Sequence, residues 1–300
     1  MKSFLSIEEL SPKVISDLVN SAADFKVIRD SHDKPLQGQT WGLLFTKSST
    51  RTRLSFEVGV HELGGNALFL SSKDLQLGRG EPIKDTARVM GKMLHGLIIR
   101  TYAHQDVEDF ASWGKIPVVN ALTDDEHPCQ ILADLLTIQE KLGTWEGKKI
   151  AFIGDGYSNM TISWMWAAKH LGFDLHIAAP KNAQPPQEFL DTLNAPNVVI
   201  TDQPAEAVAE AHVINTDVWL SMGQEGQDEK EASFKGFQVN GELLAHADKS
   251  HIVLHCLPAY RGKEITEEVL EAHADTIFQQ AGNRLHAQKA VLAWLCEPSV

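Results

Sequence analysis

The sequence predicts an α/β protein with two doubly wound parallel-sheet domains. Short apolar runs alternate with amphipathic helical patterns along the 300 residues, and this alternation is typical of parallel sheets covered by helices on both faces. The polar stretch 143–149 interrupts the alternation, which then restarts. A chain of this length has room for two domains of ordinary size. We therefore expect one domain over residues 1–142 and a second that begins at residue 143.

The first domain is expected to open with a helix at Ser11-Pro12, because serine caps helices and proline fits the first helical position. Val14, Leu18 and Ala22 then recur at helical spacing and form an apolar stripe. Strands are expected at residues 41–45, 67–70, 97–100 and 116–120, and helices at 51–63, 84–95 and 130–142.

The second domain repeats the alternation after residue 149. Strands are expected at residues 150–153, 174–179, 197–201, 212–216, 251–255 and 275–279. Helices are expected at about 159–171, 186–194, 204–210, 241–246 and 265–272, and a last helix at about 283–296. Segment 222–238 is rich in Gly, Gln, Glu and Lys, and we expect a long polar loop there.

Composition limits the classes of function. With 27 Lys and Arg against 40 Asp and Glu, the net charge is −13, which argues against a nucleic-acid surface but leaves anionic small substrates possible. No apolar run approaches the roughly 20 residues that span a bilayer, and the N-terminus turns polar too soon for a signal peptide. The 3 cysteines lack metal-type spacing and favour free thiols in a reducing compartment. We expect a cytoplasmic protein.

The segment that joins the expected strand 41–45 to the following helix carries an unusual group of side chains: Ser49, Thr50, Arg51, Thr52 and Arg53. A helix N-terminus has unpaired N–H groups and the positive end of the helix dipole. An ordinary cap would need only one hydroxyl, and arginines gain nothing at a positive helix end. The group therefore predicts a site for a phosphate or a similar anion.

Further polar side chains follow other expected strands, at the edge where open α/β sheets bind ligands. They are Arg100, then His127 and Gln130, Asn159, Asp217 and Cys256. Four of them have a simpler alternative: a surface salt bridge for Arg100, a helix cap for His127, a strand-end cap for Asp217 and a buried structural thiol for Cys256. Taken together, they indicate two pockets, one basic and one mixed.

Several cofactor sites are disfavoured. The loop Gly154-Asp155-Gly156 is similar to a dinucleotide-binding turn, but Asn159 stands where the third glycine belongs. There is no phosphate-binding Walker loop, and no paired Cys or His spacing for zinc. The pair His61-Glu62 is not followed by a second histidine four residues later. We expect neither a metal nor an organic cofactor.

Four segments together resemble the transcarbamoylase family. They are Ser-Thr-Arg-Thr-Arg at 49–53, His-Pro-Cys-Gln at 127–130, His-Cys-Leu-Pro at 255–258 and Asp-Val-Trp-Leu-Ser-Met-Gly at 217–223. The last of these is similar to the amino-acid-binding loop of the ornithine branch, and the aspartate branch is not expected to carry Ser-Met-Gly. The similarity runs from the first helix to Asn283-Arg284-Leu285-His286 and the last helix.

The resemblance implies that carbamoyl phosphate and L-ornithine react to give L-citrulline and phosphate in arginine metabolism, in either direction of the pathway. It implies a carbamoyl phosphate-binding domain over residues 1–142, completed by the C-terminal helix 283–300, and an ornithine-binding domain over 143–282. It also implies a homotrimer or a multiple of trimers, in which residues 71–84 of a neighbouring subunit reach the phosphate and Gln76 makes the contact.

The resemblance also implies a role for each residue. Those expected to hold carbamoyl phosphate are Ser49, Thr50, Arg51, Thr52, Gln76, Arg100, His127, Gln130, Cys256, Leu257 and Arg284. Those expected to hold ornithine are Asn159, Asp217, Ser221 and Met222, with Cys256 beside the side-chain amine. Arg51, Arg100, His127, Asp217, Cys256 and Arg284 are the expected catalytic residues. Arginines supply the charge that a metal would otherwise bring.

The sequence departs from the family pattern at some positions. Thr46 and Gly282 stand where acidic residues are usual, and either Asn159 or Ser158 is the ligand for the ornithine carboxylate. Two alternatives to ornithine transfer stay open at this point. One is transfer to another amine, such as putrescine, lysine or an acylated ornithine. The other is a catalytically idle relative that binds an anion.

Overall fold

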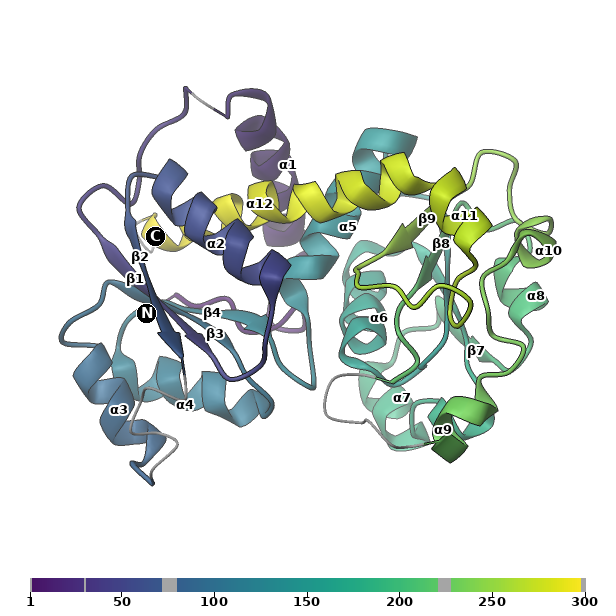
Figure 1. Ribbon diagram of the computed structural model, residues 1–300, viewed down its shortest axis with the longest axis horizontal. Coiled ribbons are helices and arrows are strands. Elements are labelled where there is room, and N and C mark those ends of the chain that lie inside the picture. The colour runs from purple at the N-terminus through teal and green to yellow at the C-terminus, as the bar shows by residue number, and fades with distance from the viewer. Residues whose placement is uncertain (1, 30, 72–79, 221–227, 298–300) are drawn as a thin grey trace. The chain divides into compact units, whose positions relative to one another are not determined.

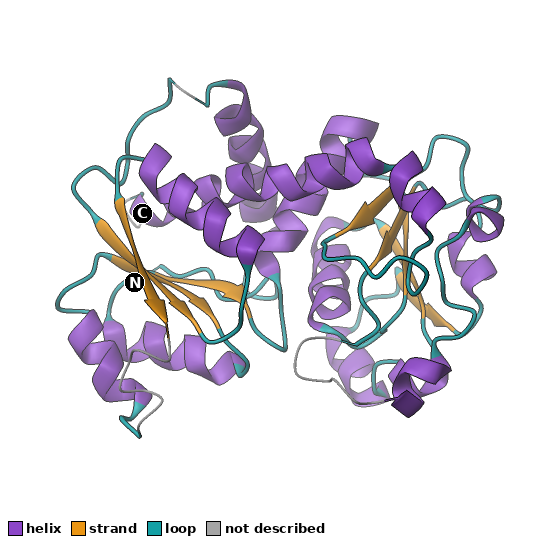
Figure 2. Cartoon of the chain, in the orientation of Figure 1, coloured by secondary structure: helices purple, strands orange, loops and turns teal. Residues whose placement is uncertain are grey.

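The computed structural model describes residues 2–29, 31–71, 80–220 and 228–297. The chain folds into two compact units, one of Met1–Leu136 with Asn283–Val300 and the other of Thr137–Gly282 (Figure 1). Strands and helices alternate along both units (Figure 2), and every strand pair is parallel. The predicted α/β class with parallel sheets is confirmed, as is the return of the C-terminal helix to the first unit.

The first unit is built on a four-stranded sheet with the order β2-β1-β3-β4. Its strands are β1 Thr40–Phe45, β2 Asn66–Ser71, β3 Gly96–Arg100 and β4 Val118–Leu122. Its helices are α1 Pro12–Val27, α2 Thr50–Glu62, α3 Ile83–Met90, α4 His104–Gly114, the start of α5 Pro128–Leu142 and the end of α12 Ala274–Cys296. Helices α3 and α4 cover one face of the sheet and bury an apolar cluster that includes Leu44, Ile99 and Phe110.

Two predicted helix starts are confirmed in this unit. Ser11 caps α1 by accepting a hydrogen bond from the Val14 N–H, with Pro12 at the first position. Ser49 caps α2 by accepting from the Thr52 N–H at 3.2 Å. Each such cap contributes about 1 kcal/mol. The cap at Ser49 also fixes the N-terminal turn of α2 directly after β1, at the carboxyl edge of the sheet.

The second unit is built on a five-stranded sheet with the order β7-β6-β5-β8-β9. Its strands are β5 Lys149–Ile153, β6 Asp174–Ala178, β7 Val198–Thr201, β8 Val213–Thr216 and β9 Ile252–His255. Its helices are α6 Asn159–Leu171, α7 Gln187–Leu193, α8 Pro204–Val208, α9 Asp228–Ser233, α10 Gly241–Leu244 and α11 Glu267–Ala272, with a short 3-10 turn at Lys181–Ala183. An apolar cluster joins one face of the sheet to α8, α10 and α11.

The structure corrects three predictions of secondary structure. The expected strand at 275–279 is part of helix α12. The apolar run around Ile277 belongs to a helical pattern, since Thr276, Ile277 and Gln280 are buried on one face and Phe278 is exposed. Helix α4 was not predicted. Part of the expected loop 222–238 is helix α9.

Within the described residues, no helix has the length and apolar character needed to cross a membrane.

Candidate functional site

The candidate anion site lies where the strand order of the first sheet reverses. From β1 the chain moves outward to β2, then returns to β3 on the other side of β1. Loops at such a switch point diverge and leave room for a ligand. Phe45, at the end of β1, pairs in register with Arg100, at the end of β3. The residues after Phe45 and the side chain of Arg100 therefore share one edge.

Thr52 is the centre of a buried hydrogen-bond network at this edge. Its hydroxyl oxygen Oγ1 accepts from Nη1 of Arg100 at 3.4 Å and from Nη2 of Arg284 at 3.0 Å. Three elements far apart in the chain, α2, β3 and α12, thus converge on one hydroxyl. All three side chains are buried. Two guanidiniums beside a helix N-terminus give this edge of the sheet a strong positive charge.

The network continues from Arg284 into α5. Nη1 of Arg284 donates to Oε1 of Gln130 at 2.7 Å, and Nε2 of Gln130 donates to Oδ1 of Asp134 at 2.8 Å. Gln130 and Asp134 are both buried. Asp134 was not singled out from the sequence, although its position four residues after Gln130 on a predicted helix was a usable signal.

His127 lies in the same positive environment. Burial holds the pKa of His127 well below its ordinary value, and the charges of Arg284 and Arg100 lower it further. The imidazole is therefore neutral near pH 7. A neutral imidazole can donate one hydrogen bond and accept another.

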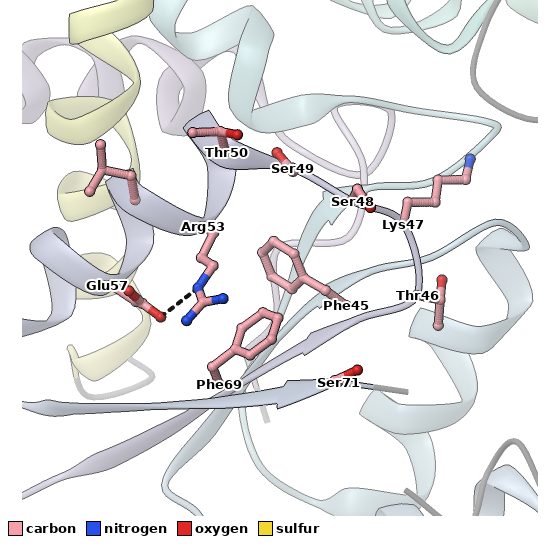
Figure 3. Close-up of a pocket in the computed structure, with 11 residues that line it drawn as sticks. Phe45, Thr46, Lys47, Ser48, Ser49, Thr50, Arg53, Glu57, Phe69 and Ser71 are labelled. Atoms are coloured by element: carbon pink, nitrogen blue, oxygen red, sulfur yellow. Dashed lines mark hydrogen bonds and ion pairs between the residues drawn. The ribbon is translucent and has the colours of Figure 1, made fainter. Parts of the chain in front are cut away.

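Arg51 and Thr50 form the first turn of α2, and Arg51 is partly buried. Arg53 was grouped with them in the sequence, but its side chain turns away. It donates from Nε to Glu57 Oε1 at 2.9 Å, and its guanidinium carbon lies 3.7 Å from the ring centroid of Phe69 (Figure 3). Together with Ser49 and Thr50, Arg53 lines a pocket of about 630 Å³, which extends from Phe45 to Ser71.

Lys47 is a further cation at this edge that the sequence did not single out. Its ammonium pairs with Asp124 and lies 4.1 Å from the ring centroid of Tyr102. The side chain is buried and borders the pocket of Figure 3.

The second unit has its own switch point, between β5 and β8. Asp217 follows β8, and Cys256 follows β9, the next strand outward. The Cys256 thiol donates to Oδ1 of Asp217 at 3.0 Å, and the Val218 N–H donates to the same oxygen at 2.8 Å. Burial raises the pKa of Asp217, although the charge of His255 acts in the opposite sense. Asp217 and Cys256 therefore form a connected pair.

His255 lies beside this pair and is hydrogen-bonded to Glu264. The Leu257 N–H donates to Nδ1 of His255 at 2.9 Å, so Nδ1 is an acceptor, and Nε2 donates to Glu264 Oε1 at 3.1 Å. Leu257 adopts a left-handed backbone conformation with φ 58°. The bond to His255 helps to hold a conformation that non-glycine residues rarely adopt.

Among the described residues, one group of three side chains could hold a metal ion: Asp217, His255 and Cys256, with ligand atoms within 4.8 Å of one another. Both ring nitrogens of His255 are already engaged with Leu257 and Glu264. The ring would have to give up one of these bonds to bind a metal.

Ser158 and Asn159 begin helix α6, next to the β5 edge of the second unit. Ser158 and Thr161 form a capping box at the start of the helix. The Ser158 hydroxyl is therefore engaged in stabilising the helix end. Asn159 occupies the first helical position. Nearby, Asp155 pairs with Lys230 of α9 at 2.7 Å.

Comparisons with known proteins match both units. Residues 2–140 match the family model described as aspartate/ornithine carbamoyltransferase, carbamoyl-P binding domain, and residues 146–295 match the one described as its Asp/Orn binding domain. The chain belongs to the aspartate/ornithine carbamoyltransferase family.

Individual relatives of this family are similar over nearly the whole chain. An ornithine carbamoyltransferase from Akkermansia muciniphila is 61% identical over 99% of this chain and 99% of its own length. One from Campylobacter fetus is 48% identical over 98% of each. The crystal structure of an anabolic ornithine carbamoyltransferase from Campylobacter jejuni is 45% identical, has a TM-score of 0.92, and covers 98% of this chain and 99% of that one.

The site residues predicted from the sequence fall into three sets. In the first unit, hydrogen bonds connect Thr52, Arg100, Gln130 and Arg284. The charges of both arginines lower the pKa of His127. The start of helix α2 contains Ser49, Thr50 and Arg51. In the second unit, Asp217 and Cys256 are bonded, Leu257 is next to them in the chain, and Asn159 begins α6. Gln76, Ser221 and Met222 lie outside the described residues.

Proposed function

We propose that this protein transfers the carbamoyl group of carbamoyl phosphate to the side-chain amine of L-ornithine, giving L-citrulline and phosphate. The observation that carries the proposal is the convergence of Arg100 and Arg284 on Thr52 at the start of α2. The first domain, residues 1–142 with 283–300, binds carbamoyl phosphate. The second, residues 143–282, binds ornithine.

The phosphate occupies the N-terminus of α2. Ser49, Thr50, Arg51 and Thr52 offer hydroxyls, a guanidinium and backbone N–H groups. An arginine fork makes two parallel charge-assisted bonds to phosphate oxygens, and the helix dipole favours the negative charge. As phosphate leaves, Arg284 balances its growing charge. Gln76 of a neighbouring subunit adds a further contact.

The carbamoyl group is polarised by donors around its oxygen. Arg100, the Thr52 hydroxyl and the neutral His127 ring all donate to it, and they stabilise the negative charge that develops when the amine attacks. The carbamoyl NH2 offers two donors. Gln130 accepts one of them through Oε1, and the carbonyl of Leu257 accepts the other, next to Cys256.

The second domain holds the amino acid. Asp217 attracts the side-chain ammonium, and Cys256 orients the amine as it becomes neutral. Asn159 binds the carboxylate, and Ser221 and Met222 complete the head-group site. The unperturbed pKa of such an amine is roughly 10.4. Burial disfavours the charged form and so increases the neutral fraction that attacks. Direct displacement of phosphate needs no covalent enzyme intermediate.

Transfer needs no metal and no organic cofactor, because arginines supply the positive charge. We further propose that the protein is cytoplasmic and forms homotrimers or multiples of trimers, which sedimentation equilibrium would test. Its product serves arginine metabolism, and the same contacts would support synthesis or breakdown equally. The similar Campylobacter jejuni protein is an anabolic ornithine carbamoyltransferase, and this likeness favours biosynthesis.

A citrulline assay with a panel of amines tests this function. Purified protein, carbamoyl phosphate and either ornithine, lysine, putrescine or N-acetylornithine are incubated, and each carbamoylated product is quantified. Ornithine should give the highest kcat/KM, and Arg51→Ala should lose most of it. A preference for another amine would favour a related transferase. No product from any amine, with phosphate binding equal in wild type and Arg51→Ala, would favour an idle anion-binding protein.

A further inference from the structure

Asp134 is a buried carboxylate outside the motifs that suggested the function. It lies on α5, one turn after Gln130, with no exposed surface. Oδ1 of Asp134 accepts a hydrogen bond from Nε2 of Gln130 at 2.8 Å. A charge at such a position is costly unless it has hydrogen-bond donors around it, so its presence beside Gln130 needs an explanation.

The contact determines which way the Gln130 amide faces. A glutamine side chain has one end that only accepts and one end that only donates, and Oδ1 of Asp134 is the acceptor in this contact. With Nε2 directed at Asp134, Oε1 has to point to the opposite side. There it accepts from Nη1 of Arg284 at 2.7 Å. Arg284 therefore donates in two directions, to Thr52 on one side and to Gln130 on the other, and Gln130 passes a hydrogen bond on to Asp134.

A reversed amide would fail at both of its contacts, and at Asp134 its oxygen would face a carboxylate oxygen, so that an acceptor would meet an acceptor. Its NH2 group would face the guanidinium of Arg284, so that a donor would meet a donor. The same NH2 group would face the NH2 of a carbamoyl ligand. An oxygen at this position instead suits a ligand that carries NH2 on its carbonyl carbon, and discriminates against an analogue with a methyl group there, because buried polar groups left unpaired are costly.

We propose that Asp134 is a positioning residue that selects the carbamoyl group over an acetyl group by fixing the amide orientation of Gln130. The inference rests on the proposed carbamoyl phosphate site. Acetyl phosphate is the matched probe, since it has the same phosphate and carbonyl and differs only in CH3 for NH2. Asp134 touches neither probe and acts only through Gln130.

Calorimetric titration of carbamoyl phosphate and acetyl phosphate, without ornithine, tests the proposal in the full chain. The variants are Asp134→Asn, which keeps the side-chain volume nearly constant, and Asp134→Leu, which is larger and removes every polar atom of the side chain. In wild type, carbamoyl phosphate should bind more tightly than acetyl phosphate. Asp134→Leu should weaken carbamoyl phosphate about tenfold, the scale of one lost hydrogen bond to a charged group, and leave acetyl phosphate nearly unchanged. Asp134→Asn should fall between, since its amide can pair with Gln130 in either orientation.

Glu62→Gln is the control for a purely structural effect. Glu62 is a largely buried carboxylate of the same unit, and it pairs with Lys289 at 2.7 Å and with Arg29 at 2.6 Å. Its loss should lower the thermal midpoint and leave the ratio of the two dissociation constants unchanged. If Asp134→Leu does not fold, Asp134→Asn carries the test alone.

The proposal is overturned if the Asp134 variants lower the thermal midpoint while the ratio of dissociation constants stays at the wild-type value. It is also overturned if wild type binds both phosphates equally. Failure of the proposed reaction looks different. Wild type would then make no citrulline although it still discriminated between carbamoyl phosphate and acetyl phosphate.

Discussion

Arg284 and Thr52 are separated by 232 residues in the chain, and Nη2 of Arg284 donates to Oγ1 of Thr52 at 3.0 Å. The bond joins the C-terminal helix α12 to the N-terminal turn of α2. Arg100 donates to the same oxygen. One hydroxyl thus accepts hydrogen bonds from two guanidiniums at the helix end where we expect the phosphate. Its removal should therefore weaken the binding of carbamoyl phosphate.

Thr52→Val keeps the shape of the side chain and removes the shared acceptor. Each guanidinium loses a hydrogen bond worth about 1.5–3 kcal/mol. We expect the KM for carbamoyl phosphate to rise at least about tenfold and kcat to fall. Steady-state citrulline kinetics measure both. The matched control is Ser55→Ala on the same helix, whose hydroxyl donates only to the carbonyls of Arg51 and Thr52. Equal kinetics for the two variants would contradict the role of Thr52.

Asp217→Asn should weaken the binding of ornithine and leave the binding of carbamoyl phosphate unchanged. The variant removes the negative charge that attracts the side-chain ammonium, so the KM for ornithine should rise about a hundredfold. L-norvaline has the same amino-acid head group without the side-chain amine. Its inhibition constant should stay near the wild-type value. A parallel loss of norvaline binding would show that Asp217 shapes the pocket instead of binding the amine.

The rate should rise with pH because the attacking amine must be neutral. Its neutral fraction grows about tenfold per pH unit below a pKa of roughly 10.4. At subsaturating ornithine and saturating carbamoyl phosphate, citrulline formation should therefore rise steeply between pH 6 and 9. Burial lowers the pKa of His127 and so works against protonation of that ring at the acid end of this range. A flat profile would rule out selection of the neutral amine.

Stability should fall on acidification, in part because of His286. Burial, with the charges of Lys289, Lys26 and Arg29, lowers its pKa from 6.5 to about 4. Between these values the unfolded chain binds a proton that the folded chain does not, so the free energy of unfolding decreases as pH falls through this window. The loss should reach at most about 3 kcal/mol near pH 4.

Urea unfolding of wild type and His286→Gln at pH 7, 6 and 5 measures this contribution. The variant cannot take up the proton, so its free energy of unfolding should depend less on pH than that of wild type. The same dependence in both proteins would assign the acid sensitivity to other groups.

The strand pattern and the group of side chains at the candidate anion site could be read from the sequence because their signals are local. Each buried parallel strand is a short apolar run, and Ser49 to Arg53 are adjacent in the chain. Helix α4 was missed because its ends lack signals. Its N-cap is Ala103, which makes no side-chain bond, and it ends at Lys115 in a left-handed conformation where glycine would be usual.

The strand expected at 275–279 shows a limit of short apolar runs. Thr276, Ile277 and Phe278 have strand-like side chains, but a short run cannot distinguish a strand from a buried helix segment. In the structure these residues belong to the 23-residue helix α12. The pairing of Lys47 with Asp124 joins residues far apart in the chain and depends on tertiary packing. The pairing of Gln130 with Asp134 is local to one helix, and its spacing was a signal in the sequence that was missed.

The most direct test of the proposed carbamoyl transfer is the stoichiometry of products from purified protein supplied with carbamoyl phosphate and L-ornithine. We expect one phosphate released for each citrulline formed, with no metal added, and a large loss of both products in the Thr52→Val protein. Phosphate release without citrulline, or citrulline formation that Thr52→Val leaves unchanged, would contradict it.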